Sequence, residues 1–143
     1  MERFVYVSVS RFVEEGLRNP IQPGFLRAYF DGKRQAESAI VSAFGLDRSA
    51  IIAPTFIYGG DAFSLSPPRV ASAYGSLVER VLSLPPLRAL AAAAPGPVGL
   101  ALRSPVSVDA VAAAAAAAAL GRPGAMGRLD GADEINVAAQ LCP

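Results

Sequence analysis

Two apolar segments on either side of one long helical segment constrain the fold of this chain most. Residues 4–9, FVYVSV, are β-branched and aromatic with little alternation, which is typical of a strand covered on both faces in a parallel sheet. Residues 25–44 repeat apolar side chains at near-helical spacing, and Gly45 follows as a left-handed stop. Residues 49–60, SAIIAPTFIYGG, predict a short buried strand that Pro54 breaks into a loop. This order predicts a right-handed βαβ unit and an α/β fold.

The second half of the chain carries mainly helical patterns. A stripe over residues 70–82 predicts a helix that begins after Pro67-Pro68 and stops at Pro85-Pro86, whereas residues 87–104 resist assignment.

The C-terminal segment predicts two further helices. Ser107 is a suitable cap for a helix from Val108 through eight consecutive alanines, residues 112–119. The stretch 121–131, GRPGAMGRLDG, is interpreted as a glycine-rich turn that precedes no helix able to receive a pyrophosphate. The tail predicts one last helix with Asn136 as its cap.

Composition excludes several functional classes. The formal charge is +1, with 13 basic and 12 acidic residues and no basic stripe, so nucleic acid is not an expected partner. Histidine is absent and Cys142 is the single cysteine, which excludes imidazole-activated nucleophiles and argues against a metal site. The N-terminus lacks the pattern of a secretory signal, and no apolar run reaches the ~20 residues of a transmembrane helix.

Tyr29 and Lys33 form the one pair that indicates chemistry. Their i, i+4 spacing places both side chains on one face of the predicted helix. A nearby ammonium lowers the pKa of a tyrosine, which can then act as a general acid or base. The alternative is solvated helix surface, with Lys33 forming an ordinary pair with Glu37 one turn on.

Four ordered segments resemble the short-chain dehydrogenases/reductases, in the extended and atypical branch related to NAD-dependent epimerases/dehydratases. FVYVSVS looks like the strand that ends in the active-site hydroxyl residue, and YFDGKRQAE is similar to the Tyr-x-x-x-Lys helix. IIAPTFIYGG resembles the strand that runs into Arg-Pro-x-x-x-Tyr-Gly, with Ala53 in the place of the arginine, and PVSVDAVAAA resembles the late Val-x-Asp-Val-Ala helix start. Within that branch the chain is most similar to relatives of the 39-kDa accessory subunit of respiratory complex I and to organellar proteins linked to quinones.

The resemblance implies roles for particular residues. Tyr29 would exchange a proton with the substrate oxygen, and Lys33 would lower the pKa of Tyr29 and bind the nicotinamide ribose of NAD or NADP. The active-site hydroxyl would come from Ser8 or Ser10. The residues implied beside the nicotinamide are Pro54, Thr55, Phe56 and Ile57.

The resemblance also implies which part of the family's fold is present. The glycine-rich fingerprint expected after a first strand is missing, so we expect the second half of a doubly wound, Rossmann-type parallel sheet that lacks its first βαβ units. Residues 1–64 would belong to the NAD(P)-binding domain, and residues 65–143 to a smaller, mainly helical substrate region. The chain would then be a fragment or a truncated product with an unpaired sheet edge.

Three functions remain open at this point. The first is an oxidoreductase acting on a carbonyl or hydroxyl of a small or apolar, quinone-like substrate. The second is a non-catalytic structural or assembly protein of an organellar respiratory complex, with self-association as a possibility. The third is a membrane-surface or lipid-binding module built on the apolar residues 65–104. By resemblance the location would be a mitochondrion or chloroplast.

Overall fold

The computed structural model describes residues 3–17, 24–59, 69–70, 72–94, 98–99 and 102–142, and all structural statements below concern these residues. The strands are β1 (Phe4–Val7), β2 (Ser49–Ala53), β3 (Ile57–Tyr58), β4 (Arg69–Val70), β5 (Val106–Ser107) and β6 (Gly127–Asp130). The helices are α1 (Arg11–Leu17), α2 (Gly24–Phe44), α3 (Ser72–Leu82), α4 (Pro85–Ala93), α6 (Val108–Ala119) and α7 (Ala132–Ala139).

A parallel sheet in the order β1-β2-β6 forms the centre of the molecule, which confirms the α/β fold. Val5 pairs with Ala50 and Ile52 pairs with Leu129. A second, smaller parallel sheet has the order β4-β3-β5 and lies beyond the carboxyl end of β2. In the described part of the chain, β1 has a strand neighbour on one side only.

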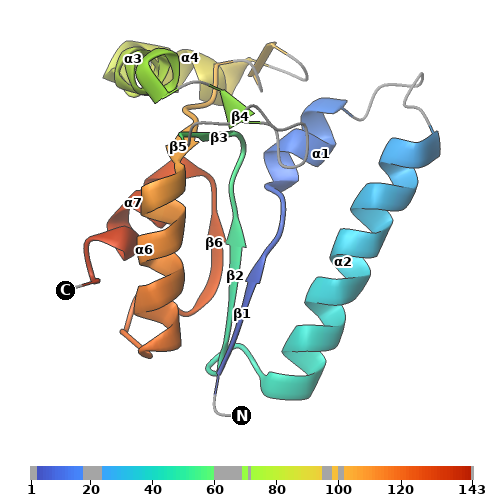
Figure 1. The fold of residues 1–143 in the computed structure, drawn as a ribbon. Coiled ribbons are helices and arrows are strands. Elements are labelled where there is room, and N and C mark those ends of the chain that lie inside the picture. The colour runs from blue at the N-terminus through green and yellow to red at the C-terminus, as the bar shows by residue number, and fades with distance from the viewer. Residues whose placement is uncertain are drawn as a thin grey trace.

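Helices cover both faces of the main sheet (Figure 1). Helix α2 packs on one face of β1 and β2, and α6 packs on the other face beside α7. The strands alternate accordingly, because Phe4 stacks on Phe44 of α2, whereas Val5 packs in the core cluster on the α6 side. All five residues of β2 are buried, as expected of a central parallel strand.

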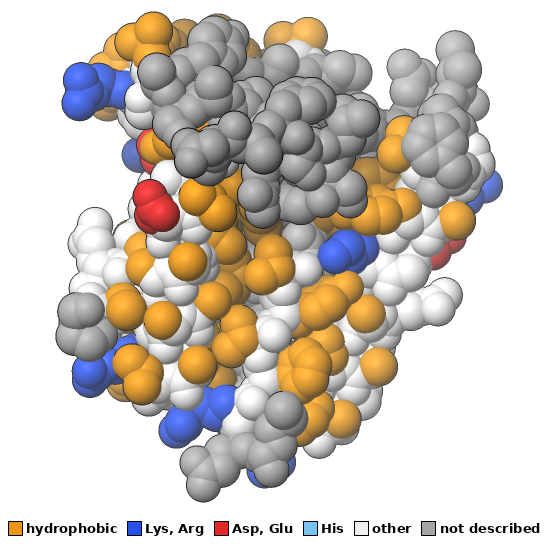
Figure 2. Space-filling view, in the orientation of Figure 1, with side chains coloured by type: hydrophobic (Ala, Val, Ile, Leu, Met, Phe, Trp, Pro, Cys, Tyr) orange, Lys and Arg blue, Asp and Glu red, His pale blue; other side chains and the backbone are white. Residues whose placement is uncertain are grey.

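The long helix and the alanine helix form largely as the sequence predicts. Helix α2 begins at Gly24 and ends before Gly45, whose φ of +75° is the left-handed stop. Helix α6 begins after Ser107, whose Oγ accepts a hydrogen bond from the Ala110 amide at 3.0 Å. The buried positions of α6 are Val111 and three alanines, which allow α7 to pack closely. Figure 2 shows apolar side chains gathered over α6 and the strands beside it.

The predicted end of the helix before Pro85-Pro86 is confirmed, because α3 ends at Leu82. The two prolines also form the first turn of α4, where a missing amide costs no hydrogen bond, in a region that the sequence left unassigned. Two predictions in the second half of the chain are wrong. Asn136 is not a cap and lies inside α7, which begins after Gly131. The stretch 121–131 is not only a turn, because residues 127–130 form β6 and lead through Gly131 directly into α7.

Several predicted features fall outside the described residues or are not decided by them. The expected helix entry at Pro67-Pro68 lies outside the described residues. We expect a domain boundary between residues 64 and 65. Strand β6 follows this boundary and pairs with β2, which precedes it, so the main sheet contains strands from both sides. Among the described helices, none has the length and apolar character needed to cross a membrane.

Candidate functional site

The carboxyl edge of the main sheet brings the predicted site residues together. Ser8 and Ser10 follow β1, Pro54 to Ile57 follow β2, and Lys33 reaches the same edge from α2. Ligands of open parallel sheets usually bind at this edge, because the loops and helix ends that follow the strands converge there. The geometry therefore makes this edge the candidate site.

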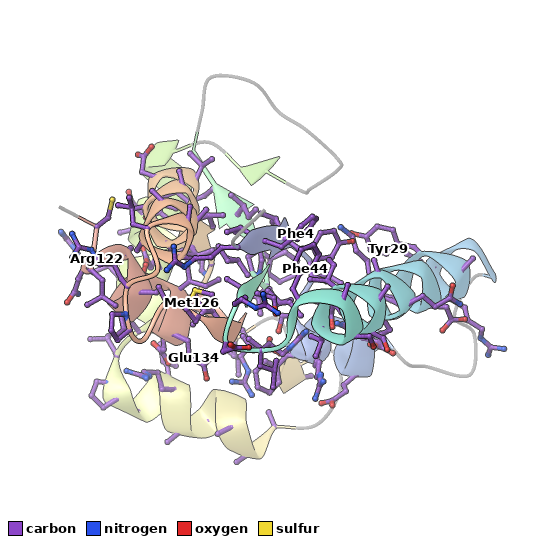
Figure 3. The ribbon with its side chains drawn as sticks, turned by 90° about the horizontal axis from the view of Figure 1, so that it is seen from below. Phe4, Tyr29, Phe44, Arg122, Met126 and Glu134 are labelled. Atoms are coloured by element: carbon purple, nitrogen blue, oxygen red, sulfur yellow. The ribbon has the colours of Figure 1, made fainter. Side chains whose placement is uncertain are left out.

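Lys33 and Tyr29 lie next to the open side of β1. The Lys33 Nζ donates to the Val7 carbonyl oxygen at 3.2 Å and lies 5.8 Å from the centroid of the Tyr29 ring. It lies 5.0 Å from the centroid of the Tyr6 ring as well. Tyr29 is 44% exposed, and its hydroxyl makes no hydrogen bond within the described part of the chain. Figure 3 shows Tyr29 leaving α2 on the side of Phe44, toward β1.

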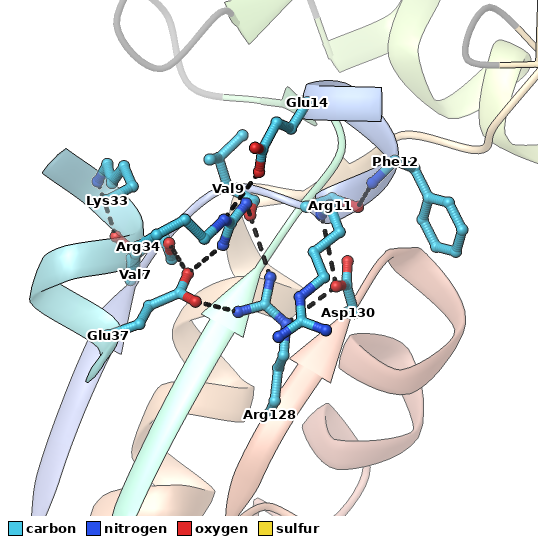
Figure 4. A network of polar contacts seen from close by, with 12 residues as sticks. Val7, Val9, Arg11, Phe12, Glu14, Lys33, Arg34, Glu37, Arg128 and Asp130 are labelled. Carbon is cyan, nitrogen blue, oxygen red and sulfur yellow. Dashed lines mark hydrogen bonds and ion pairs between the residues drawn. The ribbon is translucent and has the colours of Figure 1, made fainter. Parts of the chain in front are cut away.

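Ser8 belongs to a different group of contacts. Its hydroxyl donates to the buried carboxylate of Glu37, which also accepts hydrogen bonds from Arg34 at 2.5 Å and Arg128 at 2.6 Å (Figure 4). Both arginines donate to the Val9 carbonyl oxygen, at 3.1 and 3.3 Å. Glu37 thus ties the end of β1 to α2 and β6.

The charge of Glu37 is stabilised by its donors. Burial alone would raise the pKa of this carboxyl, but the hydrogen bonds from Arg128, Ser8 and Arg34 outweigh burial and hold its pKa below the usual value. Burial likewise opposes the charge of Arg34, whose pKa is nevertheless raised by Glu14 and Glu37. Glu37 is therefore ionised at neutral pH and unsuited to act as a proton donor there.

Ser10 has a structural role in this conformation. It is fully buried, and its Oγ accepts a hydrogen bond from the Phe12 amide at 3.2 Å in the first turn of α1. In the described structure neither the Ser8 nor the Ser10 hydroxyl is hydrogen-bonded to Tyr29. The predicted catalytic serines and the Tyr29-Lys33 pair therefore lie at the same edge of the sheet, and no hydrogen bond joins the serine hydroxyls to Tyr29 in the described structure.

The segment after β2 is packed into the interior. Pro54 accepts a hydrogen bond from the Ser10 amide at 3.0 Å, and the Thr55 hydroxyl donates to the Ser104 carbonyl at 3.1 Å. Phe56 packs with the cluster of Val9, Val13 and Phe30, and Ile57 is buried in β3. The four residues predicted beside a nicotinamide thus connect the two sheets, and all except the partly buried Phe56 are buried.

Sequence reasoning missed the charged residues at the centre of this edge. Glu37 was considered only as a surface partner of Lys33, yet its side chain is 7% exposed and pairs with Arg34 and Arg128. Arg128 and Asp130 are not among the predicted site residues, because the sequence does not predict a strand over residues 127–130. A usable signal was the alternation of Arg128, Leu129 and Asp130, which fits a strand with one polar face.

The described residues contain no group of three or more acidic or thiol side chains arranged to hold a metal ion. Comparisons with models of known families, with curated proteins and with solved structures find no match to this chain.

Proposed function

We propose that this chain provides the Tyr-x-x-x-Lys half of a dinucleotide site in an oxidoreductase of the short-chain dehydrogenase/reductase type. The observation that carries the proposal is the position of Lys33 and Tyr29 at the carboxyl edge of a parallel sheet, beside the open side of β1. A ligand bound there would lie over the strand ends, as dinucleotides do in doubly wound folds. The open edge supports a Rossmann-type sheet that continues beyond β1.

The residues fit a nicotinamide dinucleotide in part. Lys33 uses one of its three N–H donors on Val7, so two remain for ribose hydroxyls. Tyr29 offers an exposed hydroxyl that is not engaged in the described structure. The bound dinucleotide would supply a hydride to a carbonyl as NADH or NADPH, or accept one from an alcohol in its oxidised form. The glycine-rich turn for its pyrophosphate is missing from this sequence.

The chain's own residues would handle the proton. The Tyr29 hydroxyl would donate its proton to the oxygen of a substrate carbonyl, or accept it from an alcohol in the reverse direction. The Lys33 ammonium would stabilise the tyrosinate that results, by its charge and proximity. The substrate is a carbonyl or hydroxyl compound, and a small or quinone-like molecule fits the apolar character of residues 65–104.

A second candidate is a non-catalytic structural or assembly protein of an organellar complex. The hydrogen bonds of the two serines favour this candidate, because the Ser8 hydroxyl donates to Glu37 and the Ser10 hydroxyl caps α1. Ala53, in place of an arginine at the end of β2, supports it too. Both candidates share the fold, so the test must separate binding from turnover.

The decisive experiment compares Tyr29→Phe with Tyr6→Phe in NADH and NADPH titrations and in reduction assays with a quinone and with simple ketones. Tyr6 also lies near the Lys33 ammonium but has no proposed proton-transfer role, so it is the matched control. An oxidoreductase predicts that Tyr29→Phe keeps dinucleotide binding and loses turnover by at least about 100-fold, whereas Tyr6→Phe keeps both. Binding without turnover in the unmodified chain would favour the second candidate. Absence of binding, both by the chain alone and after addition of a segment that supplies the glycine-rich turn, would contradict the dinucleotide site.

A further inference from the structure

A pocket distinct from the Tyr29-Lys33 face lies where the ends of β2 and β6 meet α3 and α4. Its volume is about 230 Å³, and its walls include Phe12, Thr55, Arg103 and Asp130. Pockets for drug-sized ligands usually measure roughly 300–1,000 Å³, so this one suits a smaller molecule.

Asp130 presents an acceptor that the described part of the chain leaves unused. Its Oδ2 accepts a hydrogen bond from the Arg128 Nε at 3.0 Å and a longer one from the Arg11 amide at 3.5 Å. Its Oδ1 is buried and has no hydrogen-bond partner in the described structure. Buried carboxylate oxygens are normally paired. Because Asp130 is already ion-paired with Arg128, which it shares with Glu37, a neutral donor such as a hydroxyl group suits its Oδ1.

Arg103 presents the complementary group. Its guanidinium carbon lies 3.7 Å from the centroid of the Phe12 ring, and both residues line the pocket. The ring orients the guanidinium without consuming its N–H donors. Within the described part of the chain Arg103 makes no hydrogen bond or ion pair, whereas Arg88 at the same pocket is paired with Asp133 at 2.5 Å. Among the described residues that line the pocket, Arg103 is therefore the cation available to a ligand.

We propose that this pocket binds a small hydroxycarboxylate. Its carboxylate would pair with Arg103, and a neighbouring hydroxyl would donate to the Asp130 Oδ1. The apolar side chains of Leu82 and Leu102 in the pocket wall would contact the carbon skeleton. Thr55 lines this pocket and is also among the residues implied beside the nicotinamide, but the proposed contacts use Arg103 and Asp130 and do not depend on Tyr29 or Lys33.

The test is a titration of the isotope-labelled full chain, monitored by the amide NMR signals. Three matched probes are used: glycerate, propionate, which lacks the hydroxyl groups, and glycerol, which lacks the carboxylate. We expect saturable shifts at Thr55, Gly131 and Ala132 with glycerate, and binding at least about tenfold weaker with the other two probes. Arg103→Gln should weaken glycerate binding about tenfold. The exposed Arg122→Gln should leave it unchanged.

The outcomes are separable from those of the proposed function. Absence of saturable shifts with glycerate would overturn the proposal. So would equal binding of propionate, or unchanged binding in a folded Arg103→Gln variant. Glycerate binding by a chain that binds no NADH would support this pocket while contradicting the dinucleotide site.

Discussion

At the scale of single residues, Glu37 contributes more to the structure than its sequence neighbours suggest. A carboxylate that is 7% exposed is stable only because Ser8, Arg34 and Arg128 donate to it. The same contacts hold the Ser8 hydroxyl on Glu37. A proton-transfer role for Ser8 would therefore require its hydroxyl to leave Glu37.

Glu37→Gln is expected to lower the free energy of unfolding by about 1–3 kcal/mol at pH 7, because Arg34 and Arg128 each lose one of their two carboxylate partners and keep only Glu14 and Asp130. The folded-state pKa of Glu37 is depressed, so its contribution is present above the unfolded-state value near 4.5 and is lost as pH falls through the folded-state pKa. Urea unfolding at a series of pH values from about 3 to about 7 measures this dependence.

The decrease in the free energy of unfolding at low pH should be smaller in Glu37→Gln and unchanged in the exposed control Glu15→Gln. Ser8→Ala, which removes one donor and keeps both arginines paired, should show a partial effect. An unchanged pH dependence in Glu37→Gln would contradict the assignment of Glu37 as the stabilising carboxylate.

At the scale of elements, helix α6 shows how a run of alanines can be specific. The run has no chemical pattern, yet the fold divides it into a buried face, with Ala114, Ala117 and Ala118 fully buried, and an exposed face that includes Ala116. Small side chains on the buried face allow α7 and the sheet to pack closely against α6.

Ala117→Leu is expected to destabilise the chain by about 1–3 kcal/mol, because the added atoms have no space in a closely packed interface. Ala116→Leu adds the same side chain one position earlier, on the exposed face, and should change stability by less than about 0.5 kcal/mol. Urea unfolding of the two variants compares them directly. Equal effects would mean that α6 is not packed as described.

At the scale of the whole molecule, Glu79 joins the α3-α4 region to the body. Its carboxylate accepts hydrogen bonds from the Tyr58 hydroxyl and from Asn136 at 3.1 Å. Burial and the bond to Glu79 raise the pKa of Tyr58 to about 12. Since this pKa is raised, the stabilisation is present below pH 10 and is lost as pH rises through about 12.

Glu79→Gln is expected to loosen α3 and α4 without unfolding the main sheet. Hydrogen exchange should become at least about tenfold faster in α3 and stay unchanged in β2, and the pKa of Tyr58 should fall. The neighbouring Arg80→Gln, at an exposed position of α3, is the control. Uniformly faster exchange over the whole chain would instead indicate that Glu79 supports global stability.

Elements that depend on local sequence were predictable. Helix α2, strand β2 and the capped start of α6 follow from apolar periodicity, Gly45 and Ser107. Strand β6 was missed because Leu129 is its one buried residue, so its short sequence carries little hydrophobic signal. The start of α4 was missed because proline ends one helix and begins another with equal ease.

The sequence by itself determined an α/β fold and placed Tyr29 and Lys33 on one helical face, because both depend on spacing along a single element. The tertiary structure alone decided that Glu37 meets Arg128, 91 residues away, and that Asp130 and Arg103 line one pocket. It also decided that the Ser8 hydroxyl bonds Glu37 and the Ser10 hydroxyl bonds the first turn of α1, and that neither bonds Tyr29 in the described structure. Such contacts depend on which strands pair and which helices cover them, and local periodicity does not encode that choice.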